Sequence, residues 1–335
     1  MMLPFSIIVP VYNCSEHLEN CLESILRAGN GDGEIILVDD GSEDRSGEIC
    51  DRYSSNYDCV SCFHLNHNGV AAARNYGIDK ASRDYLLFVD GDDEWSNTFK
   101  LAELCQFVSG RDIDLFVYGY CIRNCDGKTL RDTRIHWPLN TINDWREERD
   151  SFLTYFPNGW MFPCWNKVFK RTVIQKYGIC FHQQQMEDFR FVLEYLDKIE
   201  SICFLPIEPY LYFKRIGEGS LTKSISLEMV DGCNYCHEYL LYEFGSDHHE
   251  AIHQIMVPQY IATVNKCLKS YNKVFSRQIL DKVRKNPLVA SSFGVYRAST
   301  SSERITMWLM RRGWFGVLKQ YRRVVSAIKK VNHIV

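Results

Sequence analysis

The sequence of 335 residues lacks several features that would assign it to a class at once. Its longest apolar runs, such as residues 5–12, fall far short of the roughly 20 residues that a membrane-spanning helix needs. Residues 1–4 show no basic segment followed by a cleavable apolar stretch, so we expect no signal peptide. A net charge of -3 gives no general attraction to nucleic acid, and we expect no nucleic-acid partner.

Signs of disorder are missing as well. Aromatic residues make up 13% of the chain and prolines number only 9, which excludes a chain that stays unfolded. The 14 cysteines are many, but without an export signal we expect them to remain thiols. The composition therefore predicts a cytoplasmic protein of enzyme size with a substantial core.

Short apolar runs rich in branched and aromatic residues alternate with helical patterns in the first 120 residues. Their near-continuous hydrophobicity predicts strands that are covered on both faces. Strands that recur every 25–30 residues or so, with a helix between them, are typical of an α/β fold with a mostly parallel sheet flanked by helices. The runs cover residues 5–9, 34–38, 60–65, 85–89 and 113–118.

The pattern changes near residue 224, beyond which helical periodicity continues without strands. We therefore predict two domains, a sheet domain at residues 1–224 and a helical extension at residues 225–335. The end of the extension is basic and contains aromatic residues. From Arg304 onwards it has eight Lys or Arg residues and no acid.

Polar clusters follow three of the predicted strands, at the edge of a parallel sheet where ligands bind. Neither a G-x-G-x-x-G motif nor a phosphate loop is present, and carboxylates cannot hold phosphate unaided. Asp90 and Asp92 therefore predict a Mg²⁺ or Mn²⁺ that bridges to a nucleotide diphosphate, although such a pair alone is also typical of a charged turn. The clusters are Pro10-Val-Tyr-Asn13, Asp39-Asp-Gly-Ser42 and Asp90-Gly-Asp-Asp93.

An ordered set of sequence blocks resembles a known family. The first four are Ser6-Ile-Ile-Val-Pro-Val-Tyr-Asn13, Leu37-Val-Asp-Asp-Gly-Ser42, Asn68-Gly-Val-Ala-Ala-Ala-Arg-Asn-Tyr-Gly-Ile78 and Phe88-Val-Asp-Gly-Asp-Asp-Glu-Trp95. Trp165-Asn-Lys-Val-Phe-Lys-Arg171, Met186-Glu-Asp-Phe-Arg-Phe191 and a late loop at residues 212–222 follow. Together they resemble glycosyltransferase family 2, the inverting enzymes with a GT-A nucleotide-sugar-binding fold, over residues 5–222.

The resemblance implies roles for residues that bind the donor. Pro10 and Tyr12 lie where the family packs the nucleotide base. Asp40, with Asp39 beside it, lies where a carboxylate bonds the uracil ring, and Arg74 matches a residue near the nucleotide. These assignments indicate a UDP-sugar.

The resemblance also implies the reacting groups. Asp92 matches the metal ligand, Asp90 contacts the ribose or a metal-bound water, and Asp93 faces the sugar or the acceptor. In the later block Asp188 matches the general base, and Glu187 beside it contacts the substrate. The late loop adds two residues that close over the diphosphate, Arg215 and Ser220.

The sequence thus predicts an inverting, metal-dependent glycosyltransferase that moves a sugar from a nucleotide-sugar to a hydroxyl of a glycan or a lipid-linked acceptor, in surface polysaccharide biosynthesis. A sugar nucleotidyltransferase of related fold and a non-catalytic nucleotide-sugar-binding module stay open as alternatives. The presence of Asp92 and Asp188 disfavours the non-catalytic module. The Glu187-Asp188 block and the absence of a Gly-rich, basic loop near the N-terminus disfavour the nucleotidyltransferase.

Three motifs suggest other chemistry. His249-Glu-Ala-Ile-His253 matches a zinc-peptidase signature, but the sequence offers no convincing third ligand. Cys233-Asn-Tyr-Cys-His237 matches a haem-attachment pattern, which requires export. Cys59 and Cys62 lie in a predicted strand, where residues three apart point to opposite faces. We interpret all three as structural.

The basic C-terminal segment, residues 304–335, has two interpretations. Its aromatic and basic residues favour a peripheral position on an anionic membrane surface, at the inner face of the cytoplasmic membrane. The alternative is a helix that packs on the protein and exposes a basic face.

Overall fold

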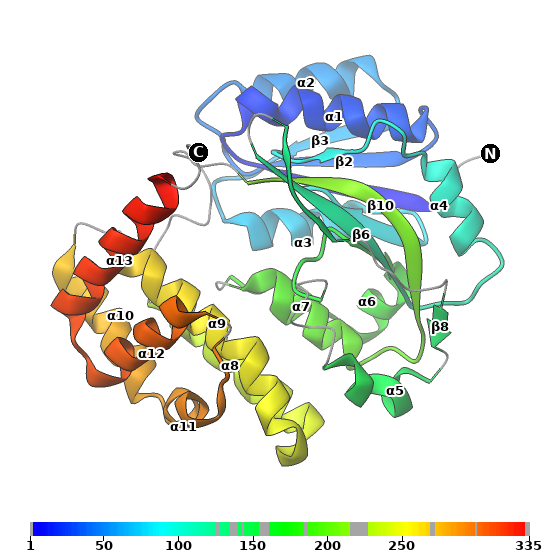
Figure 1. Ribbon diagram of the computed structural model, residues 1–335. Helices are drawn as coiled ribbons and strands as arrows, with labels where there is room; N and C mark the ends of the chain where they lie inside the picture. Colours follow the sequence, from blue (N-terminus) through cyan, green and yellow to red (C-terminus); the bar gives the residue numbers. More distant parts are fainter. Residues whose placement is uncertain are drawn as a thin grey trace. The chain divides into compact units, whose positions relative to one another are not determined.

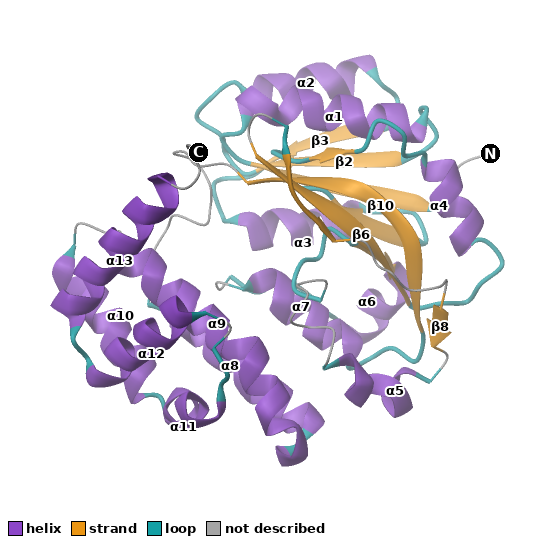
Figure 2. Cartoon of the chain, viewed as in Figure 1, coloured by secondary structure: helices purple, strands orange, loops and turns teal. Residues whose placement is uncertain are grey.

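The computed structural model describes residues 3–124, 127–133, 140–142, 144–153, 161–183, 186–214, 227–268, 272–298 and 300–331. The chain divides into two compact units. The first comprises Met1–Gln183 and Glu187–Ser220, and the second comprises Gln184–Met186 and Leu221–Val335. Figure 2 shows strands and helices in the first unit and helices in the second.

The first unit is a sheet covered by helices (Figure 1). Its described strands are β1 (Phe5–Val11), β2 (Glu34–Asp39), β3 (Val60–His64), β4 (Tyr85–Phe88), β5 (Glu94–Trp95), β6 (Leu115–Asn124), β7 (Thr129–Thr133), β8 (Asn140–Ile142), β9 (Lys167–Lys170) and β10 (Ile202–Lys214). Its helices are α1 (Ser15–Gly29), α2 (Ser46–Asn56), α3 (Val70–Lys80), α4 (Leu101–Val108), α5 (Trp145–Phe152), α6 (Arg171–Tyr177) and α7 (Glu187–Leu196).

The sheet has the strand order β3-β2-β1-β4-β9-β6-β10-β5, with β7 beside β6 and β8 beside β10. Pairing is parallel from β3 to β4, as the strand–helix alternation predicts. Beyond β4 the sheet is mixed, because β9 pairs antiparallel with both β4 and β6. The predicted α/β fold is confirmed, and parallel pairing recurs between β6 and β10, while the pairs with β5, β7, β8 and β9 are antiparallel.

Strand β1 lies at the centre of the parallel half and is buried along its whole length. Helices α1 and α2 cover one face of the parallel strands, and α3 covers the other (Figure 1). Helix α3 packs so closely on β1 that a Cβ on Gly77 would lie 2.4 Å from Cγ2 of Ile8. Glycine at this position therefore lets α3 rest directly on the central strand.

The second unit is helical in its described part, in agreement with the predicted helical C-terminal region. Its helices are α8 (Glu228–Phe244), the short 3-10 turn η3 (Ser246–His248), α9 (His249–Leu268), α10 (Lys273–Lys285), α11 (Pro287–Val295), α12 (Ser301–Arg312) and α13 (Phe315–Val331). Within the described residues, no helix is both long enough and apolar enough to cross a bilayer.

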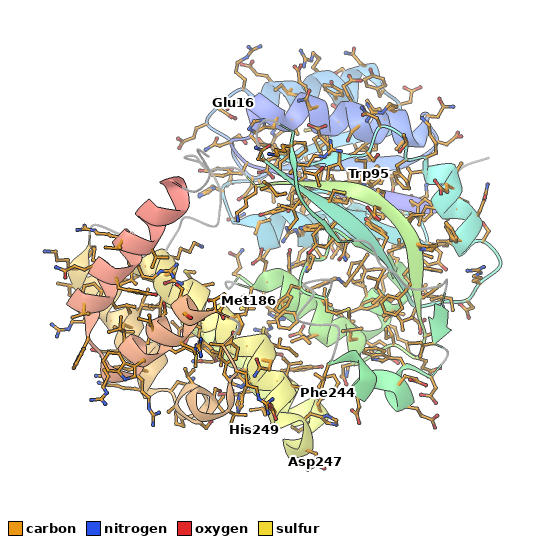
Figure 3. The ribbon with its side chains drawn as sticks, in the orientation of Figure 1. Glu16, Trp95, Met186, Phe244, Asp247 and His249 are labelled. Atoms are coloured by element: carbon orange, nitrogen blue, oxygen red, sulfur yellow. The ribbon has the colours of Figure 1, made fainter. Side chains whose placement is uncertain are left out.

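Histidines occupy the core between α8 and α9. His237 Nε2 lies 3.1 Å from His253 Nδ1, and His253 Nε2 lies 3.1 Å from Nδ1 of His249. His249, which is labelled in Figure 3, begins α9. His237 and His253 are fully buried, as are Cys233 and Cys236. The haem-like motif therefore contributes to helix packing, as expected. The peptidase-like motif forms part of a histidine chain.

The basic C-terminal segment forms α12 and α13 in its described part. Met307, Leu309 and Met310 of α12 are buried, so one face of this helix packs on the unit. Trp308 of α12 and Trp314, which lies between α12 and α13, are each 48% exposed, and their rings meet edge to face with centroids 5.2 Å apart. The segment thus has a packed side and an exposed aromatic, basic side.

Candidate functional site

The carboxyl ends of β1, β2 and β4 place the three polar clusters at one edge of the sheet. The backbone N–H of Asn13 donates to Ser42 Oγ over 3.0 Å, which joins the loops after β1 and β2. Asn13 adopts a left-handed conformation with φ 47, so its side chain can also accept from Glu43 N–H. A Cβ on Gly91 would lie 3.0 Å from Sγ of Cys14, so the loop after β4 contacts the loop after β1.

The two carboxylates at the end of β2 are buried and fully engaged with the protein. Asp39 accepts from the backbone and hydroxyl of Ser42 with one oxygen, and its other oxygen lies 2.9 Å from His64 Nδ1. Asp40 accepts from the backbone N–H groups of Asn68 and Gly69, each at 2.7 Å. Asp40 thereby binds two successive amides immediately before α3.

The residues expected to pack a nucleotide base lie beside these carboxylates. Pro10 is buried within β1 and Tyr12 follows the strand, half-buried. The Tyr12 ring stacks on the ring of His67 with centroids 4.4 Å apart. His67 Nδ1 lies 3.6 Å from Asp40, so an aromatic surface borders the two aspartates.

Arg74 of α3 joins motifs that are distant in the sequence. One guanidinium nitrogen, Nη2, donates to Asp90 Oδ1 over 2.9 Å. The other, Nη1, donates to Glu187 over 3.2 Å and to Asp188 over 2.5 Å. Arg74 is only 3% exposed, and its guanidinium also lies 5.2 Å from the ring centroid of Phe181. One buried cation therefore pairs with three carboxylates, although its charge can balance only one of them.

Asp188, the residue expected to act as the general base, has a raised pKa. Burial raises its pKa, and the charges of Glu187 and Asp90 raise it further, while Arg74 and a hydrogen bond from the Cys164 thiol lower it. The balance raises the pKa of Asp188 to about 7. A carboxylate with such a pKa can take up a proton near neutral pH.

Asp93 differs from its neighbours because it is buried, at 1% exposed. One of its oxygens accepts from the Tyr210 hydroxyl over 2.9 Å, and the other accepts from the backbone N–H of Phe213. Burial raises its pKa well above the usual range, and the charges of Asp92 and Asp90 add to the effect. A substrate contact of Asp93 would require the exchange of one of these bonds.

Aromatic rings cover the β10 side of the site. Trp165 stacks on Tyr210 at 4.3 Å and on Tyr212 at 5.7 Å. The Tyr210 hydroxyl also accepts from the backbone N–H of Asp90, so this stack is bonded to the loop after β4. The sequence analysis identified the block that begins at Trp165 but missed Tyr210 and Cys164. Neither has a distinctive local pattern in the sequence.

The predicted residues thus fall into three groups. Arg74, Asp90, Glu187 and Asp188 form one ion-paired cluster, Asp39 and Asp40 lie beside Tyr12 and Pro10, and Asp93 is tied to β10. Asp92 follows β4 and is half-buried. Arg215 and Ser220 lie outside the described residues.

Comparison with known proteins identifies the family, because the family model named glycosyl transferase family 2 matches residues 6–178. The chain belongs to glycosyl transferase family 2. It is 30% identical over 225 residues to the uncharacterised glycosyltransferase EpsJ of Bacillus subtilis, an alignment that spans 66% of this chain and 64% of EpsJ. It is 26% identical over 227 residues to a cholesterol galactosyltransferase of Borreliella burgdorferi, spanning 66% of this chain and 63% of that protein.

Among solved structures, this chain is similar in fold to Staphylococcus aureus TarS, residues 1–349, crystallised in complex with UDP-GlcNAc. The TM-score is 0.69 at 18% sequence identity, with 98% of this chain and 92% of the TarS chain covered. At this identity the likeness establishes a shared fold. The predicted GT-A fold is therefore confirmed.

Proposed function

We propose that this family 2 protein transfers a sugar from a UDP-sugar to a hydroxyl group of a glycan or lipid-linked acceptor, with inversion at the anomeric carbon. The observation that supports this most is the pairing of Arg74 with Asp188. It places a carboxylate with a pKa of about 7 beside Asp90, at the edge where the three motif loops meet. A nucleotidyltransferase or a silent binding module has no evident use for such a base.

A divalent cation fits the residues after β4. Asp92 is half-buried, and the Asp90 side chain is 26% exposed with only Oδ1 held by Arg74. Negative charge gathers here, since the charge of Asp92 helps to raise the pKa of both Asp93 and Cys14. Carboxylate oxygens suit Mg²⁺ or Mn²⁺, and such an ion would stabilise the negative charge of a departing diphosphate.

The residues of this chain then have separate tasks. Asp188 takes the proton of the acceptor hydroxyl as its oxygen attacks the anomeric carbon. Arg74 holds Asp188 in place and keeps its pKa from rising further. Tyr12 packs against the nucleotide base of the donor. The stack of Trp165 on Tyr210 and Tyr212 excludes water beside the sugar.

The choice of UDP follows from the base-binding motif around Asp39 and Asp40, and the fold relative TarS was crystallised with UDP-GlcNAc. A role in polysaccharide assembly follows from relatives such as TuaG of Bacillus subtilis, described as a putative teichuronic acid glycosyltransferase and 33% identical over 140 residues. The exposed side of α12 and α13, with Trp308, Trp314 and basic residues, would hold the protein on an anionic membrane surface near lipid-linked acceptors.

A donor screen tests the proposal. UDP-, GDP- and dTDP-sugars are titrated with Mn²⁺ by calorimetry, and slow hydrolysis of each donor is followed. We expect Mn²⁺-dependent binding of a UDP-sugar that is lost in Asp92→Ala and kept in Asp79→Ala, which removes an exposed acid from α3. Equal binding with a chelator present would contradict the metal assignment, and binding without any turnover would favour the non-catalytic module.

A further inference from the structure

A second group of possible metal ligands lies at the outer strand of the sheet, outside the site described above. The Asp51 carboxylate, the Cys62 thiol and the His64 imidazole each offer one ligand atom, and these atoms lie within 4.8 Å of one another. Among the residues that the structure describes, no other set of three His, Cys, Asp or Glu side chains meets this distance. We call these three residues the edge cluster.

The local structure explains how the edge cluster forms. Cys62 and His64 are two residues apart on β3, so their side chains point to the same face. Helix α2 packs on this strand and supplies Asp51. Cys59 and Cys62, the pair that the sequence offered as a possible chelate, are three residues apart, and Cys59 is absent from the edge cluster.

The distances suit a tetrahedral ion. Cys62 Sγ lies 3.5 Å from His64 Nε2, and Asp51 Oδ1 lies 3.0 Å from the same nitrogen. Zinc held tetrahedrally at about 2.0–2.3 Å from its ligands separates N from S by about 3.5 Å and N from O by about 3.4 Å. The separation of Cys62 Sγ from His64 Nε2 therefore already matches that of two zinc ligands. The Asp51 side chain is 66% exposed and can withdraw by a few tenths of an ångström.

His64 is already oriented as a metal ligand would be. Its Nδ1 lies 2.9 Å from Oδ2 of Asp39, whose side chain is 5% exposed. Metal-binding histidines characteristically donate their second N–H to a carboxylate in this way, which leaves Nε2 to face the ion. A bound metal would displace the proton that Nε2 otherwise shares with Asp51, since a ligating imidazole is neutral on that nitrogen.

We propose that Asp51, Cys62 and His64 bind a transition-metal ion of the Zn²⁺ type, with water as the fourth ligand. Mixed nitrogen, sulfur and oxygen ligands favour such an ion over Mg²⁺ or Mn²⁺, which prefer the oxygen ligands of Asp90 and Asp92. The proposal does not depend on glycosyl transfer. The edge cluster is nevertheless connected to the proposed donor site through Asp39. One oxygen of Asp39 bonds His64, and the other accepts from Ser42.

Cobalt binding to the full-length chain tests the proposal. The protein is stripped with a chelator, kept reduced with a phosphine and titrated with Co²⁺, whose bond to a thiolate gives a charge-transfer absorption. Zn²⁺ is then added to displace the cobalt. The variants are Cys62→Ser, Asp51→Asn and Asp39→Asn, with Cys59→Ser as the matched thiol control and Asp92→Ala as the control for the other cation site.

We expect one equivalent of Co²⁺ with thiolate absorption in the wild type, in Cys59→Ser and in Asp92→Ala, and displacement by one equivalent of Zn²⁺. Cys62→Ser should lose the absorption, Asp51→Asn should bind more weakly, and Asp39→Asn should lose about 10–100-fold in affinity because it orients His64. Circular dichroism establishes that each variant is folded. An absence of thiolate absorption in the wild type, or equal absorption in Cys62→Ser, would overturn the proposal.

Discussion

Arg74 Nη1 lies 2.5 Å from Asp188 Oδ1, although 114 positions separate the two residues in the chain. The guanidinium is buried, and its other arm reaches Asp90 after β4. Asp188 and the Asp90 carboxylate after β4 are therefore held by one side chain. The first two predictions concern this arrangement.

Replacement of Asp188, the proposed general base, should affect sugar transfer without affecting donor binding. Asp188→Asn keeps the shape of the side chain but cannot accept a proton, so we expect donor binding to persist and transfer to fall about 10²–10⁴-fold. Calorimetry with the donor and product formation with an acceptor measure the two effects. Asp197→Asn, just beyond the end of α7, serves as the control. Equal transfer rates in wild type and Asp188→Asn would remove the base assignment.

The pH dependence of transfer should follow Asp188. Its pKa of about 7 predicts a rate that rises with pH through neutrality, because only the ionised carboxylate accepts the proton. Arg74 lowers this pKa, so Arg74→Gln should move the rise to higher pH, while Arg74→Lys keeps the charge and should move it less. Pre-steady-state rates across the pH range measure this. Identical profiles in the two variants would contradict electrostatic coupling.

The close packing of α3 on β1 predicts a loss of stability in Gly77→Ala. The added methyl would overlap Ile8, and overpacking of this kind typically costs about 1–3 kcal/mol. Urea unfolding measures the difference. Gly294→Ala in α11 is the control, because a Cβ there meets nothing within 4 Å, and it should be neutral or stabilising by up to about 1 kcal/mol.

The buried histidines of the second unit predict acid sensitivity. Burial, together with the charges of the neighbouring histidines, lowers the pKa of His237 to about 3 and that of His253 to about 4. The unfolded chain therefore binds more protons below about pH 6.5, so stability should fall as pH drops from there, by up to about 1.4 kcal/mol per pH unit for each histidine.

Thermal unfolding at about pH 7.5 and pH 5.5 measures this slope. His253→Gln should flatten the slope, while His17→Gln, outside the second unit, should not. A melting temperature that does not change between the two pH values would contradict the prediction.

The exposed side of α12 predicts binding to anionic vesicles. Each basic residue near such a surface contributes about 1 kcal/mol, so replacing Arg311 and Arg312 with Gln should weaken binding about 30-fold. Replacing Lys273 and Arg277 of α10 with Gln changes the net charge equally and is the control. Sedimentation with phosphatidylglycerol vesicles measures both. If the two double variants behave alike, net charge alone attracts the protein, and the aromatic side has no special role.

Much of the fold could be predicted from the sequence, because strands such as β1 and β4 are apolar runs whose burial is evident locally. The antiparallel insertion of β9 could not, since Lys167–Lys170 is short and its partners are set by tertiary packing. The candidate site shows the same division. The motifs containing Asp90 and Asp188 were identified, but their connection through Arg74 was not, because no spacing rule relates residues on separate helices and loops.

Single residues were missed for a related reason. Cys164 and Tyr210 matter through what they contact, and neither contact has a local sequence signature. The edge cluster was missed because the only local motif at this strand is the pair Cys59 and Cys62. The two-residue period of a strand instead brings Cys62 together with His64.

The bonds from Asp40 to the amides before α3 affect how mutants of this protein should be interpreted. Asp40 belongs to the motif expected to recognise the base, yet it fixes the beginning of the helix that carries Arg74. A substitution of Asp40 would displace the guanidinium and, through it, Asp188, the proposed general base. Its kinetic signature would be a fall in turnover rather than a change of nucleotide preference, so activity measurements alone would assign Asp40 to the wrong step.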